Sequence, residues 1–215
     1  MLHLYGHPFS SYTWKAQIAL HTAAVPYELM VVAPDQPDNM AFVAAKGGPL
    51  ALFPVLRDGD ETIFEATSII EHLAACHPAA DLIPSDPAEA RTARNLDRVF
   101  DNYVMTPMQG VVAEYIRAPA SVDAERCDEG RKKLRRAYDW LENRLVGYRP
   151  ERVTIVECAA APSLFYADWV EPIGEERPRL AGYRSWLLAQ PEVVACVEAA
   201  RPFRHYFPPG APDRD

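Results

Sequence analysis

Apolar and polar positions in the first third of the chain follow two alternating patterns. Residues 2–5 and 27–32 are short runs rich in strand-forming side chains, whereas residues 11–24 between them have the length of a helix. This order predicts a βαβ unit. A polar loop that contains a proline follows, and a short helix is then expected around residues 40–45.

A β-hairpin is expected next. The Asp58-Gly59 pair is typical of a tight turn, and residues 62–64 return as the paired strand. Because proline has no N–H group, Pro54 is expected to end a loop and to begin an edge strand. A cis Phe53–Pro54 bond there would present backbone atoms to a ligand.

A third helix follows the hairpin, with Glu65, Ala66 and Thr67 at its start, and it is expected to stop before Pro78. The free N–H groups and the positive dipole end of a helix attract anions. The start of this helix therefore suits a carboxylate.

From Asp86 onward the strand signal is lost and helical patterns replace it. Asp86 is a capping residue, Pro87 suits the first helical position and Glu89 suits the third. Thr154 and Glu157 form a second capping box. Apolar residues at helical spacing are expected in the core: Leu96, Val99, Phe100, Tyr103, Val104, Leu134, Tyr138, Leu141 and Leu145.

The element order βαβ, α, ββα is that of a thioredoxin-like domain. The predicted fold class is therefore α/β plus all-α. We expect a thioredoxin-like domain over residues 1–78, a linker, and a C-terminal helical bundle domain over residues 86–215.

Composition narrows the choice of partners and compartment. The net charge of −8 disfavours nucleic acid and anionic lipid surfaces, and no apolar run reaches the roughly 18 residues needed to span a membrane. The four cysteines, Cys76, Cys127, Cys158 and Cys196, have no metal-ligand or CxxC spacing, so no metal site is expected. The chain opens with a strand pattern instead of a signal sequence, which favours a reducing cytoplasm.

Four segments in this order resemble the glutathione S-transferase family: residues 4–15, the proline hairpin with the helix start at Glu65, the segment Ile69-Ile70-Glu71-His72-Leu73, and the linker of residues 81–87. The resemblance extends over nearly the whole chain. It implies a cytoplasmic homodimer that binds glutathione, a tripeptide thiol, as its co-substrate.

The resemblance implies that the chemistry takes place at the first helix. Glutathione reacts as a thiolate, and a thiol with a pKa of about 8.5 is only a few per cent ionised at neutral pH. Ser10 or Ser11 could donate a hydrogen bond to the sulfur while the helix dipole adds positive potential. Residues 10–15, SSYTWK, resemble a zeta-type motif in which the first serine acts, whereas a beta-type alignment points to Ser11. We favour Ser10; helix capping by either serine and sulfur contact by Tyr12 remain alternatives.

The same resemblance assigns the binding residues. Phe53, next to Pro54, would pair its backbone with the cysteinyl part of glutathione, and Glu65 would accept from the glutathione amine. Ala66 departs from the family, which commonly has a serine there for the γ-glutamyl carboxylate. The backbone N–H of Ala66 or Thr67 would have to compensate.

Leu52 is a second departure, since the family often has Lys or Gln there. The apolar electrophile is expected between the domains, against His7 and Phe9 on one side and Met108 and Tyr115 on the other.

Two basic features are also interpreted. The run of residues 131–136 is taken as a solvated helix face. Arg91, Arg94 and Arg98 share a helix face where this family pairs its subunits, so dimer salt bridges are expected from them.

The resulting prediction is a detoxification enzyme, a glutathione transferase that conjugates the glutathione thiolate to small apolar electrophiles. A catalytically weak binding or regulatory protein of the same fold is one alternative. A zeta-like glutathione-dependent cis–trans isomerase is another, although it should need cationic groups near the pocket that the sequence does not clearly place.

Overall fold

The computed structural model describes residues 1–148 and 150–215 and begins with a mixed four-stranded sheet. The strands are β1 (Leu2–Gly6), β2 (Tyr27–Val31), β3 (Val55–Asp58) and β4 (Glu61–Phe64), in the spatial order β2-β1-β3-β4. β1 and β2 pair in parallel, as the predicted βαβ unit requires, whereas β1–β3 and β3–β4 are antiparallel. The sheet is that of a thioredoxin-like fold.

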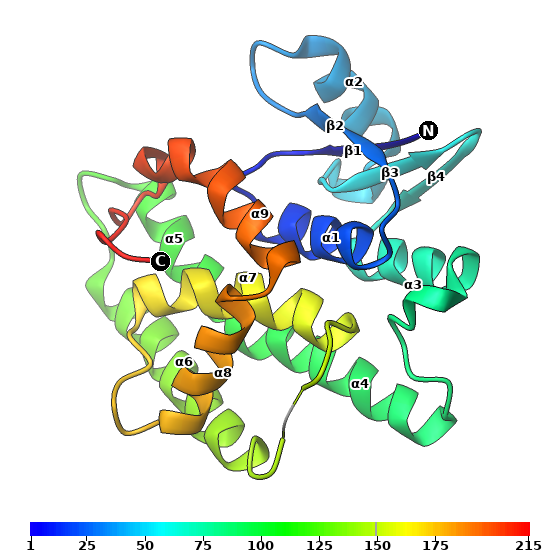
Figure 1. The fold of residues 1–215 in the computed structure, drawn as a ribbon. Helices are drawn as coiled ribbons and strands as arrows, with labels where there is room; N and C mark the ends of the chain where they lie inside the picture. The colour runs from blue at the N-terminus through cyan, green and yellow to red at the C-terminus, as the bar shows by residue number, and fades with distance from the viewer. Residues whose placement is uncertain (149) are drawn as a thin grey trace.

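Helices cover both faces of this sheet (Figure 1). α2 (Pro37–Lys46) lies on one face, and α1 (Ser11–Thr22) and α3 (Ala66–Cys76) lie on the other, between the sheet and the remaining helices. Two short 3₁₀ turns, η1 (Gly48–Leu50) and η2 (Pro78–Ala80), complete this part. α3 ends just before Pro78, as the sequence predicted.

The expectation that Pro54 begins an edge strand is wrong. The strand that follows it, β3, lies between β1 and β4 and is therefore an interior strand of the sheet, not an edge. The proline is tolerated because pairing starts one residue later, at Val55, which lies opposite Tyr5 and Phe64. The Phe53–Pro54 bond itself is cis, as predicted.

The second part of the chain is helical in the described residues. It contains α4 (Pro87–Val99), the π-helical segment η3 (Phe100–Met105), α5 (Thr106–Arg117), α6 (Ala124–Arg144), α7 (Ile155–Val170), α8 (Pro178–Leu188), α9 (Pro191–Ala200) and the 3₁₀ segment η4 (Arg201–Tyr206). Asp86 caps α4 by accepting the N–H groups of Ala88 and Glu89, both at 2.9 Å. The domain boundaries at residues 78 and 86 stay a prediction.

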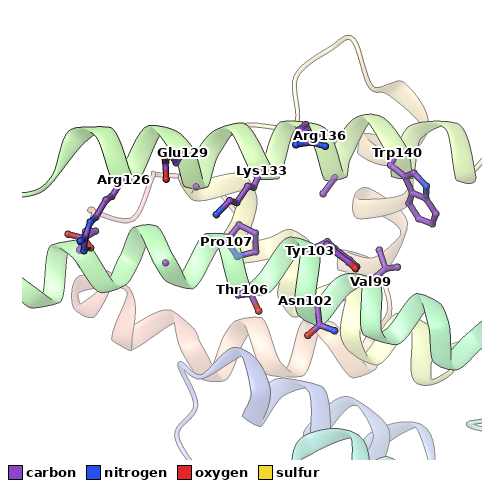
Figure 2. Close-up of a pocket in the computed structure, with 14 residues that line it drawn as sticks. Val99, Asn102, Tyr103, Thr106, Pro107, Arg126, Glu129, Lys133, Arg136 and Trp140 are labelled. Carbon is purple, nitrogen blue, oxygen red and sulfur yellow. Dashed lines mark hydrogen bonds and ion pairs between the residues drawn. The ribbon is translucent and has the colours of Figure 1, made fainter.

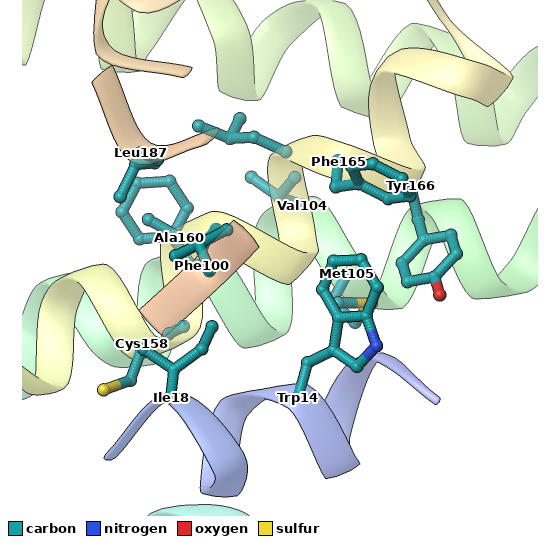
Figure 3. Packing of buried hydrophobic residues seen from close by; sticks show 14 of the residues in the cluster. Trp14, Ile18, Phe100, Val104, Met105, Cys158, Ala160, Phe165, Tyr166 and Leu187 are labelled. Atoms are coloured by element: carbon teal, nitrogen blue, oxygen red, sulfur yellow. The ribbon is translucent and has the colours of Figure 1, made fainter. Parts of the chain in front are cut away.

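α7 is the central helix of the core. All of its residues are buried, and its N-terminus has the predicted capping box of Thr154 and Glu157. Figure 3 shows Trp14 and Ile18 of α1 packed against this helix, near Phe100 and Met105 from η3. The two parts of the chain therefore share one hydrophobic core.

Most predicted core residues are buried, but the prediction that Tyr103 lies in the core is wrong. Phe100 and Val104 are almost completely buried, whereas 63% of Tyr103 is exposed. The π-helical segment changes the rotation per residue, so the 3.6-residue spacing that placed Tyr103 inside does not continue through it. Thr106 donates its hydroxyl to the Asp101 carbonyl oxygen at 3.0 Å across the end of this segment.

Candidate functional site

The loop between β1 and α1 is held by its own hydrogen bonds. Trp14 Nε1 donates to the Pro8 carbonyl oxygen at 2.6 Å, and the His7 backbone N–H donates to Thr13 Oγ1 at 3.2 Å. Gly6 is required beneath Thr13, because an added Cβ would lie 2.5 Å from Thr13 Oγ1. The loop therefore fixes where α1 begins.

Both predicted serines lie at this helix start. Ser10 is the N-cap residue, and its Oγ accepts the Thr13 N–H at 3.3 Å, which leaves the hydroxyl hydrogen free to donate. Ser11 is the first helical residue and is 8% exposed; its hydroxyl has no hydrogen-bond partner among the residues that the structure describes. Helix capping by Ser10 and donation to a bound sulfur are therefore compatible.

Several charged side chains act on Tyr12. Burial, together with the nearby carboxylates of Asp101 and Glu65, raises the pKa of Tyr12 to about 12, although Arg98 opposes the rise. The phenol is therefore neutral at any physiological pH.

The start of α3 leaves several donors without a partner. The N–H groups of Ala66, Thr67 and Ser68 form no hydrogen bond within the described part of the chain, and the Glu65 side chain does not cap the helix. Glu65 has a φ of 70°, which is unusual for a residue other than glycine and costs about 1–3 kcal/mol. Such strain is common where backbone groups face a ligand, and free N–H groups at a helix start bind anions.

Phe53, before the cis bond to Pro54, is held in place by its side chain. The ring packs against the small cluster of Tyr5, Val43 and Val55, while its backbone N–H forms no hydrogen bond to any described residue. Leu52 is 59% exposed, so nothing covers the outer side of this segment. The segment therefore has backbone groups available for an extended peptide.

A buried ionic cluster joins the starts of α1 and α3 to α4. Lys15 Nζ lies 2.6 Å from Asp97 Oδ1 and 2.7 Å from Asp101 Oδ2, and the three side chains are at most 9% exposed. Arg98 contacts both aspartates from the surface side, with its Nε 2.9 Å from Asp97 Oδ2. Burial raises the pKa of Asp101, opposed mainly by Lys15.

Thr67 belongs to this cluster, which affects one predicted role. Its Oγ1 accepts from Lys15 Nζ at 2.8 Å and from Arg98 Nη2, and donates to Asp97 Oδ2 at 3.3 Å. A hydroxyl has one hydrogen to donate, so the Thr67 side chain cannot also donate to a ligand carboxylate. Only its backbone N–H can take the role predicted for Thr67.

Sequence reasoning missed this cluster. The available signal was the Asp97 and Asp101 pair, four residues apart on one face of a helix, together with a lysine between Trp14 and Ala16 in α1. Lys15 was part of the SSYTWK segment but was not assigned a role.

Of the predicted pocket residues, His7 and Phe9 contact the helical part. The Phe9 ring lies edge-on to Tyr166, whose hydroxyl donates to the Phe9 carbonyl oxygen at 2.9 Å, and the His7 ring contacts Phe203 of η4. Burial lowers the pKa of His7, so its imidazole is neutral at pH 7.

Met108 and Tyr115 belong to the core cluster against which Phe9 also packs. Met108 is 4% exposed inside the core, and Tyr115 is half-buried against the same core. Met108 therefore has little exposed surface for a substrate, and the assignment of these two residues to the pocket stays a prediction. Methionine and aromatic residues at helical spacing, such as these two in α5, are typical of a packed core.

A wide groove lies elsewhere, between α4–η3–α5 and α6. It has a volume of about 950 Å³ and is lined by Tyr103, Pro107 and Trp140 together with Lys133 and Arg136, as Figure 2 shows. None of the residues predicted for the glutathione or electrophile sites lines it. The groove combines exposed aromatic side chains with cations.

The three arginines that share a face of α4, Arg91, Arg94 and Arg98, have mainly partners within the chain. Arg94 Nε and Nη2 bind Glu71 of α3 at 2.7 and 3.0 Å, and Arg98 belongs to the buried cluster. Of these three arginines, only Arg91 has no ion pair with a described residue and is available for a salt bridge across a dimer interface.

The described residues show neither a metal cluster nor a membrane-spanning helix. No cluster of three or more His, Cys, Asp or Glu side chains could hold a metal ion there. No helix in that part of the chain is long and apolar enough to cross a membrane.

The sheet with its cis-proline, followed by a helical bundle, defines a class of thioredoxin-like proteins that carry a helical second part. Residues 4–81 match the family model described as the N-terminal domain of glutathione S-transferase. This match, which covers the first part of the chain, supports a member of the glutathione S-transferase family.

Individual relatives agree with this assignment. Glutathione S-transferase 1 of Dianthus caryophyllus is 25% identical over 166 residues, which are 77% of this chain and 74% of the relative. The probable maleylacetoacetate isomerase of Vibrio cholerae is 26% identical over 209 residues, 93% of this chain and 96% of the relative. A glutathione S-transferase structure from Methylobacterium radiotolerans, in complex with glutathione sulfonate, has a TM-score of 0.75 at 26% identity and covers 91% of this chain and 94% of its own.

Proposed function

We propose that this protein is a glutathione transferase that conjugates the glutathione thiolate to small apolar electrophiles. The observation that carries the proposal is that two helix starts with uncommitted donors, those of α1 and α3, lie side by side. Lys15 of α1 reaches Thr67, the second residue of α3, at 2.8 Å. One ligand with a thiol at one end and a carboxylate at the other can therefore engage both helices.

The tripeptide fits these donors in an extended form. Its cysteinyl backbone pairs with Phe53, its γ-glutamyl carboxylate meets the N–H groups of Ala66 and Thr67, and Glu65 accepts from its amine. The Methylobacterium neighbour, whose structure contains glutathione sulfonate, supports glutathione as the co-substrate. The sulfur then points toward Ser10 and Ser11.

The chemical task is to keep the thiol ionised. Lowering its pKa by two units requires about 2.7 kcal/mol of preferential thiolate stabilisation. One hydroxyl donor to a charged sulfur supplies about 1.5–3 kcal/mol, and the helix dipole adds about 0.3–1 kcal/mol. The thiolate attacks the electrophilic carbon, a C–S bond forms, and the leaving group or the added electron pair takes a proton from solvent.

The electrophile lies against the apolar wall beside the β1–α1 loop. Phe9 and the neutral His7 form its surface, and the buried rings of Tyr166 and Trp169 pack behind Phe9. An apolar substrate is favoured because a charged one would lose its hydration without a counterion.

Ultraviolet absorbance of the bound thiolate tests this proposal. The wild type titrated with glutathione should show a thiolate band at neutral pH, and the Ser10→Ala, Ser11→Ala double variant should lose it. The single variants assign the donor, with Ser10→Gly as the control for capping, since glycine is nearly as good as serine at an N-cap. Binding without any thiolate band would instead favour a binding or regulatory protein of this fold.

Glutathione-dependent cis–trans isomerisation is a second candidate. The Vibrio cholerae relative, named as a probable maleylacetoacetate isomerase, aligns over 96% of its length, and Arg98 is a half-exposed cation beside the start of α3. In this reaction the thiolate adds to a cis double bond, the bond rotates, and the thiolate leaves. An isomerase assay with maleylacetoacetate, run beside a conjugation assay, separates the two activities.

The predicted cytoplasmic location, a role in detoxification and the homodimer belong to the same proposal. The exposed aromatic groove between α4 and α6 supports an interface with a second copy. Localisation of a tagged full-length chain and its mass in solution test these two points.

A further inference from the structure

The first two residues of α3 offer a bound carboxylate no free side-chain donor. Ala66 has no hydroxyl, and the single hydroxyl hydrogen of Thr67 is directed to Asp97 at 3.3 Å. A charged carboxylate that gains only backbone N–H contacts loses part of the hydration it had in water. Another donor near Thr67 would complete the site.

Arg98 is the charged donor nearest to this point. Its Nη2 contacts Thr67 Oγ1, so the guanidinium of an α4 residue lies at the first turn of α3. The Arg98 side chain is 49% exposed. Its Nε and Nη2 are engaged by Asp97 and Asp101, whereas Nη1 has no partner among the described residues. Nη1 carries two N–H groups, which suit a carboxylate oxygen.

The charge arrangement of the cluster supports this role. Lys15 and Asp97 are 1% exposed and Asp101 is 9% exposed, so both carboxylates and one cation lie inside. Lys15 already pairs with each aspartate. Arg98 is therefore the member of the cluster that faces solvent, and an approaching anion meets a cation.

We propose that Arg98 binds the γ-glutamyl carboxylate of glutathione through Nη1, and so replaces the hydroxyl that Ala66 lacks. This inference rests on the proposed glutathione site and adds to it a residue from the helical part. Glutathione binding then bridges α3 and α4, which the ionic cluster already holds together.

Isothermal titration with two ligands tests the inference. The ligands are glutathione and 4-aminobutyryl-cysteinyl-glycine, which lacks only the glutamyl α-carboxylate. Arg98→Gln should weaken glutathione binding about 10- to 100-fold and leave binding of the analogue unchanged, because only the charged contact is removed. Arg94→Gln is the matched control, since Arg94 lies one turn earlier at 47% exposure and binds Glu71. It should bind both ligands like the wild type.

The failures are distinguishable. If the wild type does not bind glutathione, the proposed function falls and takes the inference with it. If the wild type binds but Arg98→Gln binds glutathione equally well, or weakens both ligands equally, the proposed function stands and the inference is overturned. A loss in Ser68→Ala without one in Arg98→Gln would assign the contact to that exposed hydroxyl instead and also overturn it.

Folding of the variant is checked by circular dichroism. If Arg98→Gln does not fold, Arg98→Lys decides, because it keeps the charge but loses the planar pair of donors. A loss of several-fold for glutathione with none for the analogue supports the inference, and equal effects on both ligands overturn it.

Discussion

Glu65 adopts a backbone conformation that its side chain does not prefer. Its φ of 70° costs about 1–3 kcal/mol, yet its carbonyl oxygen accepts the Ile69 N–H at 3.0 Å and so begins α3. A glycine would relieve the strain but would remove the carboxylate. The residue therefore combines a costly backbone turn with an exposed acid beside free N–H groups, which is the combination expected of a ligand contact.

Tyr12 provides a prediction at this scale. Its raised pKa of about 12 keeps the phenol neutral, and the charged groups that act on it are Asp101, Arg98, Glu65 and Asp97. Tyr12→Phe should leave the glutathione thiolate band and the pH profile of conjugation unchanged below about pH 10. Stopped-flow absorbance across pH 5–9 would measure both. A rise of the thiolate pKa in Tyr12→Phe equal to that in Ser10→Ala would show that the phenol contacts the sulfur.

The residues that the sequence could assign are those whose role follows from chain order. Ser10 and Ser11 lie at the first helix start because a strand and a helix must be joined there, and Glu65 lies at the third for the same reason. Thr67 and Arg98 depend on a contact between residues 31 positions apart, so only the folded chain brings their side chains together. The loss of the Thr67 hydroxyl to the cluster could not be predicted locally.

At the scale of elements, α7 depends on its N-terminal cap. Thr154 Oγ1 accepts the Val156 N–H at 3.3 Å, and Glu157 Oε2 accepts the Thr154 N–H at 3.0 Å. Thr154→Ala should lower the free energy of unfolding by about 0.5–2 kcal/mol, because a cap is lost on the most buried helix. Thr154→Ser is the control and should lose less. Urea denaturation measures both, and equal stability of Thr154→Ala and wild type would contradict the role of the cap.

The contact between α1, α3 and α4 depends on Lys15. Lys15→Met leaves Asp97 and Asp101 buried with only Arg98 as a counterion, and should cost about 3–5 kcal/mol of unfolding free energy at pH 7. The exposed pair tested by Arg94→Gln should cost less than about 1 kcal/mol. A similar small loss in both variants would show that the buried cluster contributes little to stability.

The pH dependence of that variant follows from Asp101. Burial already raises its pKa, and Lys15 opposes the rise, so removing Lys15 raises the pKa further. A group whose pKa is higher in the folded than in the unfolded state binds its proton more readily when folded, so its contribution to stability increases as pH falls. The stability deficit of Lys15→Met should therefore be smaller at about pH 5 than at about pH 8. A deficit independent of pH would contradict this account.

Elements were predicted well where one local rule decided them. The capping residues fixed the starts of α4 and α7, and strand-rich runs fixed β1 and β2 within one residue of their observed ends. The errors arose where pairing or backbone geometry was not local. The place of β3 inside the sheet depends on β1 and β4, and the π-helical turn of η3 rotated Tyr103 outward.

At the scale of the whole molecule, the two parts of the chain form one body around α1 and α7. Trp14 from the first part packs against Phe165 and Tyr166 from the second, and Figure 3 shows these rings together. Both helix starts of the proposed site border this shared core. The site can therefore take side chains from both parts, as the Arg98 contact illustrates, while sequence patterns divide the chain into two.

The groove between α4 and α6 leads to the prediction of a homodimer. Tyr103 is 63% and Trp140 is 48% exposed there, and large exposed aromatics beside cations are typical of interface centres. The chain has a net charge of −8, and the exposed acids Glu61 and Glu65 of the sheet part are not among the residues that line this groove. A second copy can thus supply the complementary charge.

Gel filtration coupled to light scattering should give about twice the chain mass of 24.1 kDa. The double variant Lys133→Glu, Arg136→Glu places negative charge in the groove opposite the acids of the second copy, and this repulsion should raise the dimer dissociation constant more than about 100-fold. Lys46→Glu, on the exposed side of α2, changes a charge outside the groove and should remain dimeric. A monomeric wild type would refute the dimer, and a double variant that stays dimeric would move the interface to another face.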